Sequence, residues 1–183
     1  MTEITDMALS PVEQRFILHW GEMGTRWGIN RTVAQVHALL FLSSRPLHAE
    51  EIANTLAVAR SNVSTSLREL QGWGIVRVVH ILGDRRDHFE SLKDVWEIFR
   101  TVAEQRKRRE IDPILQILRE CVGELEQAGS EAEYTRERLE DMLQFLTTTT
   151  GLFEEVIQMP TGALKGVTRM RGKLKSIMGL GKR

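Results

Sequence analysis

Short hydroxyl and amide side chains, together with two arginines, are concentrated in residues 60–68 of this 183-residue chain. Side chains of these types hydrogen-bond to the base edges and phosphate oxygens of nucleic acids. Most of them are poor helix formers, so a helix that carries so many of them indicates a role beyond solvation. The candidate contacts are Arg60, Ser61, Asn62, Ser64, Thr65, Ser66 and Arg68. Taken alone, the segment fits a capped, solvated surface helix equally well.

Two neighbouring arginines, Arg85 and Arg86, are the second candidate contact. They follow Gly83 and Asp84, a turn signal between two segments with strand-like composition, so we expect them at the tip of a β-hairpin. An arginine at such a tip can enter a minor groove or bind a phosphate. Asp84 and Asp87 flank the pair, and one of these carboxylates is expected to orient an arginine by a bidentate contact. The alternative is a turn of solvated charges.

The elements expected in residues 46–90 bring these two groups into one module. Residues 48–57 form a short helix, and residues 59–71 form a second helix after almost no linker. The small side chain of Ala53 lets the two helices approach closely. A hairpin over residues 75–90 follows. This order predicts a winged helix-turn-helix, in which the first helix braces the second and leaves its outward side for the major groove of duplex DNA.

A pair of helices is expected before this module. Ser10 is the predicted N-cap of the first, with Pro11 at the first helical position, where a missing N–H is tolerated. The three glycines within residues 21–28 are expected to break this helix. Asn30 is expected to cap the second helix. That helix should end before Pro46, because a proline disfavours helical conformation in the residue before it.

Long amphipathic helices are expected after the hairpin. Ser91 and Asp94 resemble a capping box at the start of the first, and Pro113 could kink or restart it. A further helix is predicted over residues 130–157. These helices carry apolar stripes that a small winged domain cannot cover, so a second copy of the chain is the simplest cover. A homodimer would place two modules on half-sites about one helical turn apart, which predicts a pseudopalindromic operator.

Charge is balanced overall, with 25 basic and 25 acidic residues, but it is unevenly distributed. Residues 45–109 carry 12 basic and 9 acidic side chains, residues 110–155 carry 3 and 12, and residues 156–183 carry 7 and none. The balanced net charge therefore hides three segments of different charge: a basic DNA-reading module, an acidic middle and a basic tail.

The predicted architecture is mainly α-helical with one β-hairpin wing, as a winged helix-turn-helix with terminal dimerisation helices. We divide it into an N-terminal helix that contributes to dimerisation (1–29), the DNA-binding module (30–92), long dimerisation helices (93–158) and a basic, flexible tail (159–183). In the tail, basic residues alternate with apolar ones at helical spacing. Contact with flanking DNA phosphates or with an anionic membrane surface therefore stays open as an alternative to a flexible tail.

Several kinds of site are not expected. The single cysteine, Cys121, excludes an internal disulfide and fits a reducing cytoplasm, and no signal peptide or membrane-spanning run is visible. The five histidines show no metal-ligand spacing, and no nucleophile–base set or phosphate loop is present. We therefore predict a cytoplasmic protein that is not an enzyme, with no metal, no cofactor and no membrane partner.

The order of elements, the Gly-Asp-Arg-Arg-Asp wing and the long helix behind it resemble the MarR family, and more closely its GbsR-like branch. The resemblance covers roughly residues 10–155, and it rests on residues 24–28, 67–70, 73–74, 83–86, 94–99 and 106–113. It implies a homodimeric transcriptional repressor whose DNA affinity responds to a small molecule or a stress signal. Regulators of osmoprotectants such as choline and glycine betaine belong to the implied branch, but no ligand residue can be carried over.

A quaternary ammonium effector would favour an aromatic cage. The available aromatics are Phe16, Trp20, Trp27 and Trp96. Packing in the core or at the dimer interface explains the same residues and is the favoured interpretation. Two other functions stay open beside the transcriptional regulator: a winged helix that binds protein, which predicts an apolar outward side on residues 60–70, and a DNA-binding protein whose tail also attaches to anionic membrane.

Overall fold

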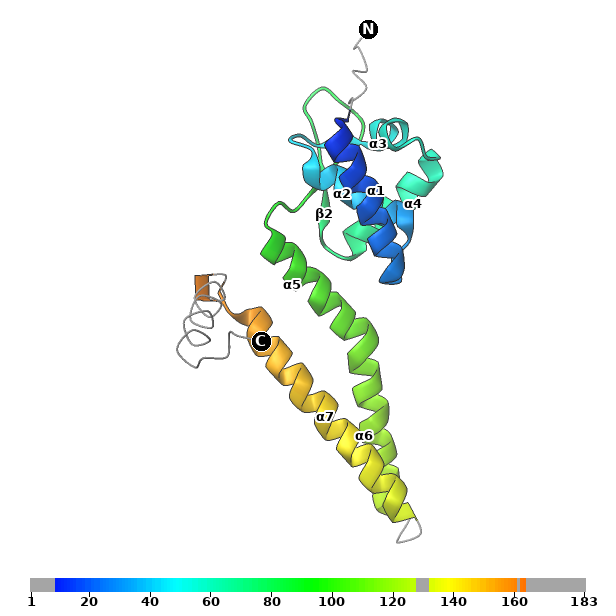
Figure 1. Cartoon of the computed structure of the whole chain (residues 1–183), viewed down its shortest axis with the longest axis vertical. Coiled ribbons are helices and arrows are strands. Elements are labelled where there is room, and N and C mark those ends of the chain that lie inside the picture. Colours follow the sequence, from blue (N-terminus) through cyan, green and yellow to red (C-terminus); the bar gives the residue numbers. More distant parts are fainter. Residues whose placement is uncertain (1–8, 128–131, 161, 164–183) are drawn as a thin grey trace, which may run out of the picture. The chain divides into compact units, whose positions relative to one another are not determined.

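The protein is described by a computed structural model over residues 9–127, 132–160 and 162–163. The chain folds as two compact units, Met1–Gln105 and Arg106–Arg183. The elements of the described residues (Figure 1) are α1 (Pro11–Arg26), α2 (Arg31–Leu42), β1 (Leu47–His48), α3 (Ala49–Leu56), α4 (Arg60–Gly72), β2 (Val76–Val79), β3 (His88–Ser91), α5 (Val95–Arg106), the π-helical η1 (Lys107–Ile111), α6 (Asp112–Gln127) and α7 (Glu133–Gln158). The predicted fold class, mainly helical with a small antiparallel sheet, is confirmed.

One apolar core holds the first unit together. Its largest fully buried side chains come from α2, α3, α4 and the sheet: Val36, Leu39, Leu40, Leu47, Ile52, Val63, Leu67, Leu70 and Ile75. Burial of each such side chain contributes roughly 1.5–3 kcal/mol, and this apolar packing fixes α4 against α2 and α3. The helix that carries the candidate DNA contacts is therefore mounted on a rigid base.

The sheet has three strands in the order β1-β3-β2, where the sequence predicted two. The third strand is the two-residue β1, in which Leu47 pairs with Phe89 and His48 pairs with His88. A strand this short leaves no alternating pattern in the sequence, because its residues are buried on both sides. It ties the start of α3 to the base of the wing.

The first helix ends within residues 21–28, as predicted, but only at Arg26, so two of the three glycines do not break it. Helix α1 runs from its Ser10 capping box to Arg26, through Gly21 and Gly24, both of which are buried. A Cβ atom on Gly24 would lie 2.6 Å from the Cβ of Ala34 in α2. These two glycines therefore allow close helix packing, and a left-handed glycine occurs only after the helix end, at Gly28 with a φ of 75°.

Helix α5 begins later than predicted. The carboxylate of Asp94 accepts the backbone N–H groups of Trp96 at 2.7 Å and Glu97 at 3.1 Å, which is an N-cap arrangement. Ser91 is the last residue of β3 instead. The expected capping box with Ser91 as the N-cap is therefore wrong, and Asp94 caps the helix alone.

Lys93, the residue before that cap, forms its hydrogen bonds at the end of a different helix, α2. Lys93 Nζ donates to the carbonyl oxygens of Leu40 (2.7 Å), Phe41 (3.0 Å) and Ser43 (2.6 Å), at the carboxyl end of α2. A cation at this end of a helix satisfies carbonyl groups that have no partner within the helix.

Nearby in α2, burial, with a smaller contribution from the Lys93 charge, lowers the pKa of His37 to about 4.

In the second unit, η1 occupies the place where the sequence predicted a kink. Pro113 has no backbone N–H to donate to the carbonyl four residues earlier, and a π turn accommodates that loss. Helix α6 then continues through Gly123 to Gln127, and α7 packs against it. Lys107 links the two helices, because its Nζ lies 2.7 Å from Asp112 Oδ1 and 2.8 Å from Glu154 Oε1.

None of the described helices is both long and apolar enough to cross a membrane. The predicted basic tail lies outside the described residues from position 164 onward. The four-part division of the chain stays a prediction.

Candidate nucleic-acid interface

A tight turn between α3 and α4 sets the direction of α4. Ala57 ends α3 in the left-handed region, with a φ of 52°, and the N–H of Val58 donates to Ala53 O at 3.1 Å. This conformation costs a non-glycine residue about 1–2 kcal/mol. Val58 packs against the core on the far side of the turn, which offsets that cost. Ala53 is 92% buried between the helices, which agrees with its predicted role as a spacer, since its exposed fraction is 8%.

Helix α4 presents most of the predicted contact residues to solvent. Six of them are exposed: Arg60, Ser61, Asn62, Ser64, Thr65 and Arg68. Ser66 is buried, with only 2% of its surface exposed. It lies one turn from both Val63 and Leu70, on the apolar side of the helix, and its small side chain fits the interior. The prediction that Ser66 faces outward is therefore wrong.

Residues 60–68 of α4 contain no Asp or Glu, and the one carboxylate of the helix is Glu69, which is half-buried. Arg68 is held only loosely: its Nε donates to Ser64 O and its Nη2 to Thr65 Oγ1, both at 3.4 Å, against about 2.9 Å for an ordinary bond. Its guanidinium can therefore turn toward a phosphate or a base. The N-cap residue, Ala59, makes no side-chain hydrogen bond, which leaves backbone N–H groups of the first turn available to a phosphate oxygen.

The two wing arginines are in different situations. Arg86 Nε donates to Asp84 Oδ1 at 2.9 Å and its Nη2 donates to Oδ2, so Asp84 holds the guanidinium by both oxygens. The expected orienting carboxylate is thus Asp84, and the Arg86 guanidinium holds the pKa of Asp84 well below its usual range. The side chain of Arg85 is exposed and makes no hydrogen bond or ion pair to any other part of the chain that the structure describes. Only Arg85 is therefore immediately available to a nucleic acid.

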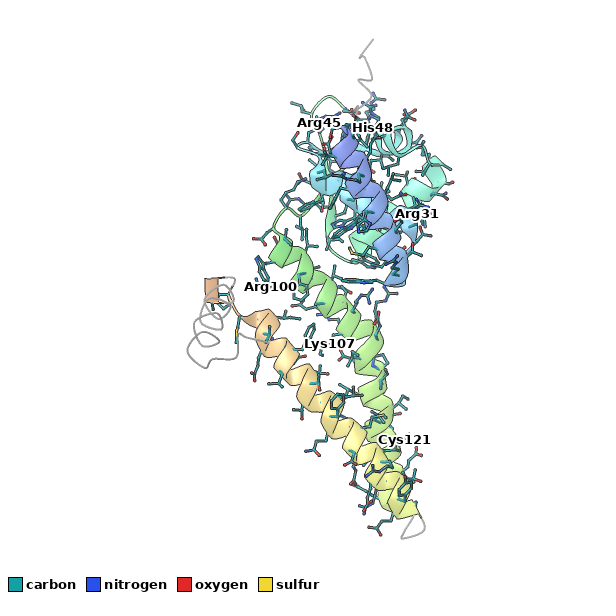
Figure 2. All side chains as sticks on the ribbon, viewed as in Figure 1. Arg31, Arg45, His48, Arg100, Lys107 and Cys121 are labelled. Atoms are coloured by element: carbon teal, nitrogen blue, oxygen red, sulfur yellow. The ribbon has the colours of Figure 1, made fainter. Side chains whose placement is uncertain are left out.

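A buried polar cluster joins the start of α3 to the wing, and no local sequence pattern predicted it. His48 is the N-cap of α3: its Nδ1 accepts the N–H of Glu51 at 3.2 Å, and Glu51 Oε2 accepts the N–H of His48 at 3.3 Å. The second carboxylate oxygen of Glu51 accepts a hydrogen bond from Arg45, which lies beside His48 (Figure 2). On the other side, His48 Nε2 is 2.9 Å from Arg86 Nη1. His88 meets the His48 ring edge-on, with centroids 5.6 Å apart.

The structure brings two of the four predicted aromatics together. Phe16 and Trp20 stack in α1 with centroids 5.4 Å apart, and both pack against the core. Trp27 follows the end of α1 and is 64% exposed, and Trp96, in the first turn of α5, is 37% exposed. The aromatic cage stays a prediction, and core packing accounts for the first pair.

An open groove of about 350 Å³ lies in the second unit, where none of these aromatics is found. Its lining is mostly polar: Lys107, Asp112, Leu115, Arg119, Thr147, Thr150, Gly151 and Glu154. Basic and acidic side chains face one space there, which suits a small polar solute. Within the described residues, no group of three or more His, Cys, Asp or Glu side chains could hold a metal ion.

One segment of the chain matches a protein family. It contains the helix-turn-helix, the exposed polar side of α4 and the wing as far as its loop. Residues 27–87 match the MarR family model. The MarR match covers about a third of the chain, from the end of α1 to the wing loop. Comparison with curated proteins gives no match.

One solved structure supports the fold over a longer stretch. A protein described as a transcriptional regulator is 20% identical, and the alignment covers 80% of this chain and 96% of that one with a TM-score of 0.65. The regulator Tm0710 of Thermotoga maritima is 17% identical over 80% and 92% of the two chains, with a TM-score of 0.38. A mutant of MepR from a multidrug-resistant S. aureus isolate is 19% identical over 76% and 99%, with a TM-score of 0.36. At 20% identity, the likeness to the first of these structures concerns the fold alone.

Proposed function

We propose that the protein is a MarR-type transcriptional regulator: a cytoplasmic homodimer, not an enzyme, that binds a pseudopalindromic DNA operator as a repressor and is released by a small solute or a stress signal. The observation that carries this proposal is the outward side of α4. Six exposed hydroxyl, amide and guanidinium side chains lie there within residues 60–68, ahead of the half-buried Glu69, on a helix fixed by its apolar side. A protein-binding winged helix would need an apolar outward side, and this side is polar.

The residues of α4 and those of the wing would contact different parts of the DNA. Arg60, Ser61, Asn62, Ser64, Thr65 and Arg68 would meet the major groove, where such side chains read base edges and position the backbone. Arg85 would enter a minor groove or bind a phosphate. Arg86, held by Asp84 and close to His48, would shape the wing more than contact DNA. Ser66 is not among the proposed contacts, because it is buried.

The second unit supports dimerisation. Along α7, Leu143 and Leu146 are half-buried and Ile157 is buried. A second apolar row of α7 is exposed and repeats at alternating spacings of three and four residues, interrupted by Thr149: Met142 (52% exposed), Phe145 (66%), Leu152 (60%) and Val156 (46%). This spacing is typical of a coiled-coil seam, and water is a poor partner for it. A second copy of the chain is the proposed partner.

The seam can be tested by its oligomeric state. Phe145→Glu would place a charge in the centre of the row, so we expect the mass measured by light scattering to fall from that of a dimer to that of a monomer. Gln144→Glu adds the same charge at an exposed neighbour on a different side of α7 and should remain dimeric. A dimeric Phe145→Glu variant would place the interface elsewhere.

DNA binding is tested by operator selection from random duplexes, followed by a salt titration. We expect recovery of an inverted repeat whose half-sites lie about one helical turn apart. Arg85→Ala should flatten the dependence of log affinity on log salt by about 2, because each phosphate contact releases about one counterion and the dimer loses one contact in each wing. Arg15→Ala removes an equally exposed arginine from α1, outside the interface, and should keep the wild-type slope. Absence of any selected sequence would refute the proposal.

The effector is proposed to be a small polar solute. The resemblance to the GbsR-like branch suggests choline or glycine betaine, and the groove in the second unit is lined by Arg119 and by the Lys107–Asp112–Glu154 ion pairs, with which such a molecule would have to compete. Repeating the operator-binding assay with choline, glycine betaine and sodium chloride at equal osmolality would separate a ligand effect from an osmotic one. If no solute changes the affinity, the release mechanism proposed here is wrong, while DNA binding itself is untouched.

A further inference from the structure

The imidazole of His48 lies between two hydrogen-bond donors. Its Nδ1 is 3.2 Å from the backbone N of Glu51, and its Nε2 is 2.9 Å from Arg86 Nη1. The residue is buried, with 5% of its surface exposed, so solvent offers little alternative to either ring nitrogen. Both contacts therefore depend on the ring itself.

A neutral imidazole carries one N–H and one lone pair. The two groups that face it, a backbone amide and a guanidinium, are permanent donors and cannot accept a hydrogen bond at nitrogen. The ring can thus accept from only one of them at a time. The other contact sets two N–H groups against each other, which is unfavourable in a buried site.

We propose that His48 is a positioning residue whose tautomer selects between the cap of α3 and the hold on the wing arginine Arg86. In one tautomer, Nδ1 accepts from Glu51 N and Nε2, which lies 3.5 Å from Glu51 Oε2, carries the proton, while Arg86 is held by Asp84 alone. In the other, Nε2 accepts from Arg86, and α3 loses its N-cap bond. The two states differ in how firmly the wing loop is attached.

Protonation adds a third state, because an imidazolium has a proton on both nitrogens and accepts from neither donor. The charged groups that face the ring are Glu50 and Glu51 from α3, and Arg86 and His88 from the wing; Arg45 and Asp84 act one contact further away through Glu51 and Arg86. Burial is the main cause that lowers the pKa of His48, and Arg86 and His88 act in the same direction against Glu51. The contact with Arg86 is therefore open only to the neutral ring, in one of its two tautomers, and is lost in acid.

A change in the attachment of the wing would alter DNA binding only if the proposed function is correct. The selection between the two contacts of His48 does not depend on that function. It is tested on the free full-length protein, so it can fail while DNA binding stands, and it can hold if DNA binding fails.

Two substitutions separate the two nitrogens. The amide oxygen of His48→Asn occupies the place of Nδ1 and can cap α3, but it cannot reach Arg86. The amide of His48→Gln reaches the place of Nε2 and can accept from Arg86, but it does not cap α3. Neither variant titrates. The readouts are hydrogen exchange of the Glu51 amide, for the cap, and the NMR signals of the Arg86 guanidinium, for the wing.

We expect opposite effects. His48→Asn should keep or slow exchange of the Glu51 amide and release Arg86, while His48→Gln should speed that exchange about fivefold, the factor that corresponds to a lost N-cap of about 1 kcal/mol, and keep Arg86 restrained. Equal losses in both variants would show a merely structural residue and overturn the proposal.

A measurement on the ring itself does not depend on the folding of either variant. The nitrogen-15 shifts of His48 report which nitrogen carries the proton. In the wild type we expect both tautomers, and in Arg86→Ala we expect the ring to move to the form with the proton on Nε2, because the competing donor is gone. An unchanged tautomer in Arg86→Ala would overturn the proposal.

Discussion

Replacing the buried histidine of α2 should make the folding of the first unit less sensitive to acid. His37 is 7% exposed and lies among aromatic rings, 6.5 Å from Trp20 and 6.3 Å from Phe41 by centroid. Its Nε2 has no hydrogen-bond partner within the described residues. His37→Leu keeps an apolar side chain of similar size at this position and cannot be protonated.

The magnitude follows from the pKa of about 4 in the folded protein against the ordinary value of 6.5. A lowered pKa in the folded state means that the unfolded chain binds the proton first. The stabilising contribution of the neutral ring is therefore complete above pH 6.5 and is lost as the pH falls toward 4. Linkage gives a loss of about 2 kcal/mol at pH 5 and about 3 kcal/mol at pH 4.

The assay is chemical unfolding at fixed protein concentration, followed by circular dichroism from pH 8 to pH 4. Many carboxylates also titrate in this range, so the measured quantity is the difference between variant and wild type at each pH. His37→Leu should cost less than about 1.5 kcal/mol at pH 8 and gain about 2 kcal/mol relative to wild type by pH 5. His19→Leu, an exposed histidine of the same unit, is the matched control for loss of an imidazole.

A His37→Leu variant that loses stability in acid in parallel with the wild type would refute this reasoning. It would mean that the folded protein accepts a proton on His37 as readily as the unfolded chain does. The same conclusion would follow if His19→Leu flattened the profile as much as His37→Leu did.

Three further predictions concern packing, capping and sequence reading. Gly24→Ala should destabilise the protein by about 1–3 kcal/mol in urea, because the new Cβ meets the Ala34 Cβ at 2.6 Å, whereas Gly72→Ala, with nothing within 4 Å, should stabilise α4 by about 0.5–1 kcal/mol. Lys93→Met leaves carbonyls of α2 without their cation and should lower the unfolding free energy by about 1–2 kcal/mol. Arg68→Ala should relax sequence preference at one operator position by about 1–3 kcal/mol, measured by competition between duplexes.

Local signals in the sequence were sufficient where the physics is local. The caps at Ser10 and Asn30 were predicted from residue type alone, because a cap is a contact between neighbours in the chain. The turn between α3 and α4 and the contact of Asp84 with Arg86 belong to the same class. The winged helix-turn-helix could therefore be assembled before any long-range contact was known.

Errors arose where a residue's role depends on a distant partner. The glycines of α1 were expected to break the helix, yet Gly24 lies inside it and allows Ala34 of α2 to pack closely. Ser66 was predicted to contact the DNA groove because of its residue type, but the position of the core decides which side of α4 is buried. Ser91 read as a cap, while pairing with Val76 keeps it in the sheet.

The sequence by itself determined the kind of module, the exposed polar helix that would meet DNA and the apolar stripe that calls for a second copy. These follow from periodicity and local hydrogen bonding, which the order of residues fixes. Only the tertiary structure decided that Arg85 is available while Arg86 is held, and that His48 faces two donors at once. The physical reason is that positions 48 and 86 become neighbours only when β1 pairs with β3, a contact that no local pattern encodes.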